Sequence, residues 1–217
     1  MTDAINIIQR EHRAIAAVVY CLDRVIKDVR DGRLAPDFDF FRAALDYIQE
    51  FPDHFHHPKE NDYLFPALAK RSPGSRKVIH DLKEQHADGE RRIADLHWKL
   101  DAYQKDAEGA FGAFAKALES YIEFQRQHIS TEEQKILPAA REHLTPDDWS
   151  EINKAFTDND DPIFGDNPKG AYDRLFSRIV SLAPAPYGLG TPTPGPAGAD
   201  EPKEPKTRKD FLGLHWV

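Results

Sequence analysis

Two His-x-x-x-Glu motifs in this sequence carry side chains that are suited to binding metal ions. The first joins His56 to Glu60, and the second joins His128 to Glu132. Residues four apart lie on one face of an α-helix, so each motif would direct an imidazole and a carboxylate toward the same point. The chain contains ten histidines, and most fall within periodic segments, which argues against a surface tag.

Two further histidines occupy positions in apolar stripes of helical spacing. His12 continues a stripe that contains Ile5, Ile8, Ile15, Val19, Leu22 and Ile26. His86 continues a stripe that contains Ile79, Leu82, Ile93, Leu96, Leu100 and Tyr103. All four long periodic segments therefore carry an inward histidine.

This coincidence predicts a metal site. Four imidazoles and two carboxylates suit a pair of first-row transition-metal ions, because imidazole favours iron, copper, nickel or zinc over magnesium or calcium. A carboxylate can bridge two ions, and two bridging glutamates would offset charge that is otherwise costly in a helical core. The predicted ligands are His12, His56, Glu60, His86, His128 and Glu132.

A purely structural role for these residues is the alternative to a metal site. A single histidine on an apolar face is more often a hydrogen-bonded core residue, and two His-x-x-x-Glu motifs alone are compatible with solvated helix faces. Glu90, four residues after His86, is either a further ligand or a residue just off the stripe. His57 lies about 100° around a helix from His56. It is therefore expected outside the ligand set, unless the neighbouring prolines distort the turn and make it a ligand.

Long helices must position these residues. Periodicity and breakers predict helices over residues 3–31, 36–70, 75–106 and 108–143, and short ones over 147–156 and 169–182. Pro52 and Pro58 inside the second helix should produce kinks or irregular turns. No strand pattern is found. The predicted fold class is all-α: an up-down four-helix bundle with extra C-terminal helices and an irregular Pro/Gly-rich tail.

The expected domain organisation has three parts. Residues 1–145 form the bundle, residues 146–183 a C-terminal helical extension, and residues 184–217 the tail. The tail begins PAPYGLGTPTPGPAG, which cannot form a regular helix or build a core. Its last residues, FLGLHWV, are apolar and are expected to dock on the bundle or to bind a protein partner.

Composition narrows the classes of function. The formal net charge is −8 and no long basic run occurs, which argues against nucleic acid and anionic membranes as partners. The one cysteine, Cys21, excludes a disulfide within the chain and argues against a thiolate metal site. No signal peptide is evident, and no apolar stretch approaches the roughly 20 residues of a membrane helix. A cytoplasmic location is expected.

The order and surroundings of the motifs resemble the HHE group of hemerythrin-like proteins over residues 1–145. The matching stretches are Glu11-His12, His56-His57-Pro58-Lys59-Glu60, Leu64-Phe65-Pro66, Glu84-Gln85-His86 and Leu137-Pro138-Ala139. The resemblance implies a non-haem di-iron centre with Glu60 and Glu132 as bridges, together with an oxo, hydroxo or water bridge. Members of the group bind dioxygen, nitric oxide or peroxide, sense iron or oxygen, or repair damaged iron centres.

Two departures from the family pattern refine this expectation. Oxygen-carrying hemerythrins have a second histidine four residues after the one on the third helix, where this chain has Glu90. One imidazole fewer argues against simple reversible oxygen carriage. Repair-type members usually carry an N-terminal cysteine-containing segment, which is not expected here because the first helix is predicted to begin at Asp3.

The residues and the resemblance together are compatible with three functions. The first is a di-iron protein that binds dioxygen, peroxide or nitric oxide for binding, sensing or a stress response. The second is a di-iron enzyme with peroxidase, catalase-like or oxidase activity. The third is an iron- or oxygen-responsive regulatory module that contacts a partner.

Overall fold

The computed structural model describes residues 3–105, 109–157 and 168–196. Helices dominate this part of the chain, which confirms the all-α class. The first long segment is α1 (Asp3–Arg30). The second contains, in order, α2 (Phe38–Ile48), η1 (Gln49–His56), α3 (His57–Lys59), η2 (Glu60–Leu64) and α4 (Phe65–Arg71). After the short η3 (Pro73–Ser75), α5 (Arg76–Gln104) forms the third, and the fourth contains α6 (Ala110–Thr131), η4 (Glu132–Ile136) and α7 (Leu137–His143).

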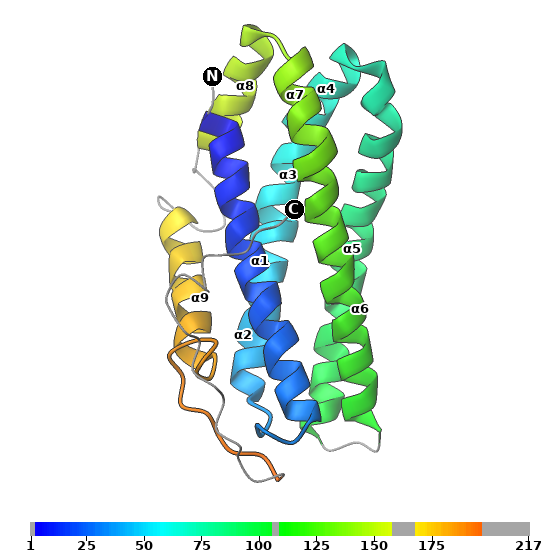
Figure 1. Cartoon of the computed structure of the whole chain (residues 1–217). Coiled ribbons are helices and arrows are strands. Elements are labelled where there is room, and N and C mark those ends of the chain that lie inside the picture. The colour runs from blue at the N-terminus through cyan, green and yellow to red at the C-terminus, as the bar shows by residue number, and fades with distance from the viewer. Residues whose placement is uncertain (1–2, 106–108, 158–167, 197–217) are drawn as a thin grey trace.

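These four segments pack as a closed ring. Helix α1 contacts α2 and α6, and α5 contacts the same two helices from the other side. Figure 1 shows the segments lying side by side, with consecutive segments running in opposite directions. Every segment therefore has one face directed to a shared interior.

The segment ends follow local backbone chemistry. Gly32, with a positive φ of 71°, lies two residues beyond the end of α1, and its N–H donates to the carbonyl of Val29 (3.1 Å). Asp37 caps α2, its side chain accepting a hydrogen bond from the Phe40 N–H (3.0 Å). Such caps satisfy backbone groups that a helix end leaves without a partner.

The second and fourth segments contain π-helical turns, in which backbone N–H groups bond to the carbonyl five residues earlier. Three bonds of this kind mark the turns: His57 to Pro52, Phe65 to Glu60, and Leu137 to Glu132. Pro66 and Pro138, just beyond the last two turns, have no N–H to donate. The irregularity predicted around Pro52 is thus present, and both motif glutamates begin a widened turn.

The apolar interior is divided into two clusters by the metal-ligand candidates. In α1 the larger cluster includes Ile15 through Ile26, whereas the smaller one includes Ala4 through Ile8. His12 lies between these two stretches. The other three segments show the same division, so a polar layer separates the two clusters across the whole bundle.

The extra helices pack on the bundle. Helix α8 (Pro146–Thr157) contacts α1 and contributes Trp149, Ile152 and Phe156 to the smaller cluster. Helix α9 (Pro168–Leu182) packs against α2 and α1. No helix within the described residues is long and apolar enough to cross a membrane.

The beginning of the tail docks on the bundle. The Ala35 N–H donates to the carbonyl of Thr193 (2.8 Å), and the Tyr187 hydroxyl donates to Asp28 (2.8 Å). Gly195 lies so close to the backbone of Gly32 that a side chain there would overlap it. The apolar end of the tail lies outside the described residues.

Candidate metal centre

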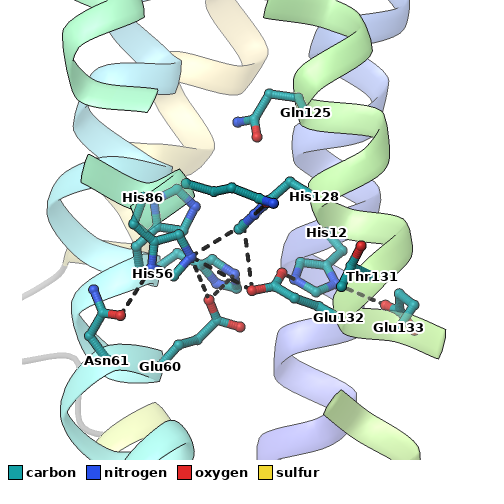
Figure 2. Close-up of polar contacts among 12 residues, drawn as sticks. His12, His56, Glu60, Asn61, His86, Gln125, His128, Thr131, Glu132 and Glu133 are labelled. Atoms are coloured by element: carbon teal, nitrogen blue, oxygen red, sulfur yellow. Dashed lines mark hydrogen bonds and ion pairs between the residues drawn. The ribbon is translucent and has the colours of Figure 1, made fainter. Parts of the chain in front are cut away.

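The predicted ligands meet in the polar layer as two groups. One group contains His12, His56, Glu60 and Glu132, and the other contains His57, His86 and His128. Within each group, the potential ligand atoms lie within 4.8 Å of one another. All seven residues are buried. Figure 2 shows the imidazoles directed toward the space between Glu60 and Glu132.

Each glutamate faces histidines of both groups. Glu132 Oε2 lies 3.3 Å from His12 Nε2, and its Oε1 lies 3.5 Å from His128 Nε2. Glu60 Oε2 lies 3.6 Å from His56 Nε2 and 3.6 Å from His86 Nε2. Both carboxylates therefore lie between the histidines of the two groups.

A ring of outer acceptors orients four of the imidazoles. The Nδ1 atoms of His56 and His12 donate to Glu11 (2.8 Å) and Glu133 (2.9 Å). Those of His86 and His128 donate to the amide oxygens of Asn61 (3.1 Å) and Gln85 (3.0 Å). Each acceptor is adjacent in sequence to a ligand candidate of its own segment and reaches the histidine of the next segment around the bundle.

The hydrogen bonds of this ring indicate whether the histidines could bind a pair of metal ions. A histidine whose Nδ1–H is held by an acceptor presents the Nε2 lone pair on its other side, the form in which imidazole binds metal. The Nε2 atoms of His86 and His128 lie 3.2 Å apart, so two lone pairs face each other without a proton to share. His12 Nε2, His56 Nε2 and all four oxygens of Glu60 and Glu132 are buried without a hydrogen-bond partner among the described residues. Such a donor set fits cations and leaves a core without cations poorly satisfied.

The electrostatics of the two groups differ. Burial alone would lower the pKa of His12, but Glu132 and Glu133 raise it to about 9. Burial lowers the pKa of His128 to about 4. The pKa of Glu60 is raised well above its ordinary value by burial and by the facing Glu132. Two carboxylates so placed cannot both ionise easily unless positive charge lies between them.

His57 lies where the sequence did not favour it. Its side chain is buried, and its ring stacks on that of His86 with centroids 3.9 Å apart and planes 13° apart. The expectation that His57 lies outside the ligand set assumed α-helical geometry. The π-helical turn of η1 holds more residues per turn, which decreases the angle between successive side chains, so His56 and His57 both face the interior.

Glu90, the other secondary candidate, is exposed and belongs to neither ligand group. Asp53 instead occupies the interior near this part of α5. Its Oδ1 lies 3.3 Å from His57 Nδ1, and burial followed by the charge of Glu90 raises its pKa to about 8. Asp53 was not singled out from the sequence, although it stands four residues before His57, the spacing of one helical face.

Nearby polar residues extend the layer along α6. The amide of Gln125 donates to the hydroxyl of Tyr121 (2.9 Å), and both side chains are buried. The outer acceptors Glu11, Asn61, Gln85 and Glu133 were likewise not predicted as functional. Their signal in the sequence is weak: each is a polar residue beside a ligand candidate.

A comparison with known families accounts for this arrangement. The hemerythrin HHE cation-binding domain matches residues 3–140, which is more than half of the chain. The chain therefore belongs to the hemerythrin HHE family, whose domain binds metal cations. Searches of curated proteins and of solved structures gave no significant match.

Proposed function

We propose that this protein is a non-haem di-iron protein whose centre lies in an up-down, hemerythrin-like four-helix bundle and binds dioxygen, peroxide or nitric oxide. One observation carries the proposal: two buried carboxylates face histidines of both ligand groups and have no hydrogen-bond partner among the described residues. Membership of a cation-binding family supports it.

The two ligand groups suggest which residues would hold each ion. His12 and His56 would hold one ion, and His57, His86 and His128 would hold the other. Glu60 and Glu132 would bridge the two ions, since each faces histidines of both groups. Iron at these positions would supply reversible one-electron chemistry and a place for a small oxidant.

The protein's own residues would keep such a centre intact. The four outer acceptors fix the imidazole rings, and second-sphere partners of this kind strengthen histidine as a ligand. The two apolar clusters on either side limit access of bulk water. With His57 included, five imidazoles surround the centre, so the ligand count no longer argues against reversible oxygen binding.

Metal content and absorption spectra test the proposal. We expect about two irons per chain after anaerobic loading, and near-ultraviolet bands that change on exposure to air. The Glu60→Ala, Glu132→Ala double variant should lose both properties while remaining helical by circular dichroism. A folded wild-type protein that takes up no iron in stoichiometric amounts would overturn the proposal.

Turnover distinguishes the binding function from the enzymatic one. A protein that binds or senses peroxide retains it, whereas a peroxidase or catalase-like enzyme consumes many equivalents for each centre. Measuring peroxide loss over time at a fixed, iron-loaded protein concentration therefore assigns the chain to one class or the other.

A further inference from the structure

The ring of outer acceptors distributes charge unevenly over the two ligand groups. Both histidines of the first group donate to carboxylates: His56 to Glu11 at 2.8 Å and His12 to Glu133 at 2.9 Å. In the second group, His86 and His128 donate to neutral amide oxygens. We propose that the two metal positions are unequal, and that Glu11 and Glu133 make the His12–His56 position the one that fills first. This inference rests on the proposed di-metal function.

The physical reason is the charge transmitted through the imidazole ring. A carboxylate that accepts the Nδ1–H of a ligating histidine makes Nε2 a stronger donor and adds negative charge close to the ion. A neutral amide oxygen fixes the ring in the same orientation without that charge. The geometry of the four hydrogen bonds is similar, so charge is the main difference between the outer acceptors of the two groups.

The two outer carboxylates are placed so that solvent screens them weakly. The Glu11 side chain is 12% exposed and that of Glu133 is 30% exposed. The second oxygen of Glu133 accepts from the neutral amide of Gln9 (2.9 Å), so this contact does not neutralise its charge. Burial of this degree lets each carboxylate act on the ion more strongly than a surface charge would.

Besides the two glutamates that face both groups, the second group has one further carboxyl nearby, that of Asp53, whose Oδ1 lies 3.3 Å from His57 Nδ1. This contact lacks hydrogen-bond geometry, since His57 Nδ1 and both Asp53 oxygens have no hydrogen-bond partner among the described residues. In the first group, each of the two imidazoles is hydrogen-bonded to an outer carboxylate. In the second group, the three imidazoles have one outer carboxyl nearby, and it is not hydrogen-bonded to them. The outer negative charge therefore remains unequal between the two positions.

Stepwise titration of the full-length, metal-free protein with cobalt(II) tests the inference, followed by calorimetry and by visible absorption. We expect two binding steps, the first tighter. The isosteric Glu11→Gln, Glu133→Gln double variant should weaken the first step by about 10–100-fold, the usual effect of losing such partners. Glu84→Gln, Glu142→Gln changes the net charge equally at two exposed positions and should leave both steps unchanged.

Two more variants identify the position and protect the test against misfolding. His12→Ala should abolish the tight step, whereas His57→Ala should retain it. Asn61→Asp, Gln85→Glu places carboxylates at the second group and should strengthen the second step. Equal steps in the wild type, or an unchanged first step in the folded Glu11→Gln, Glu133→Gln variant, would overturn the inference alone. Absence of any cobalt binding by the wild type would overturn the proposed di-metal function as well.

Discussion

Replacing Glu60 with glutamine should have opposite effects on stability in the metal-free and the metal-loaded protein. Glu60 is fully buried, and its oxygens have no hydrogen-bond partner among the described residues. Burial and Glu132 raise its pKa well above the ordinary value of 4.5. Such a residue lowers the stability of the metal-free fold and is useful only when positive charge is bound beside it.

The magnitude for the metal-free protein follows from proton linkage. A carboxyl whose pKa is raised by folding stays protonated in the folded chain while the unfolded chain loses its proton. The free energy of unfolding therefore falls as pH rises, by about 1.4 kcal/mol per pH unit above the unfolded pKa. Between pH 4.5 and about pH 6.5 the wild type should therefore lose stability steadily relative to Glu60→Gln, at this slope for as long as the folded carboxyl keeps its proton.

Bound metal should reverse the order of stability of the wild type and Glu60→Gln. An ion present at about one hundred times its dissociation constant stabilises the fold by about 2.7 kcal/mol per site. The glutamine variant lacks one of the two carboxylates that we propose as bridges and should lose most of this gain. The expected result is a variant that is more stable than the wild type in chelator and less stable with iron.

Urea unfolding followed by circular dichroism measures the stability of both the metal-free and the metal-loaded protein. The wild type, Glu60→Gln and the exposed control Glu142→Gln would be compared in chelator at both pH values, and again with ferrous iron under anaerobic conditions. A Glu60→Gln variant that is less stable than the wild type in chelator at both pH values would refute the reasoning. That result would mean that Glu60 stabilises the metal-free fold, whereas the reasoning above requires it to lower the stability of that fold.

Three further substitutions probe separate features. His57→Ala should reduce stoichiometric metal from two ions to one per chain, measured by metal analysis after gel filtration; retention of two ions would exclude His57 as a ligand. Gly89→Ala should raise the free energy of unfolding in urea by up to about 1 kcal/mol, because an added Cβ meets no atom closer than 3.6 Å. Asp148→Ala should cost about 1–2 kcal/mol, since Asp148 bonds the N–H and hydroxyl of Thr145 at the start of α8. Arg71 and Thr145 hold the pKa of Asp148 below its usual range, so this contribution should persist at neutral pH and disappear in acid, and an equal cost at both extremes would contradict it.

The sequence predicts which helix faces are buried, because these faces follow from helical periodicity alone. His12 and His86 interrupt apolar stripes, and the structure buries both. The end of the first helix was also predicted closely. The sequence placed it at residue 31, and α1 ends at Arg30, shortly before Gly32 with its positive φ. Features that depend on one helix at a time were therefore recovered.

Features that depend on irregular turns or on neighbouring helices were not recovered. His57 reaches the interior because η1 is wound more widely than an α-helix, and periodicity analysis assumes the α-helical angle. Glu11 and Gln85 each serve a histidine of another segment, and that pairing exists only after the segments have packed. The sequence shows such residues simply as polar positions beside a ligand candidate.

The division of the core explains why a metal pair would matter to the whole fold. The polar layer separates a larger apolar cluster, which includes Leu22 and Phe114, from a smaller one, which includes Leu68 and Trp149. Without cations, the facing lone pairs and carboxylates contribute little cohesion between them, whereas bound ions would join all four segments. Hydrogen exchange should therefore be faster in the smaller cluster than in the larger one in chelator, and zinc or iron should reduce the difference. Equal protection of both clusters in chelator would show that the apolar packing alone already unites the bundle.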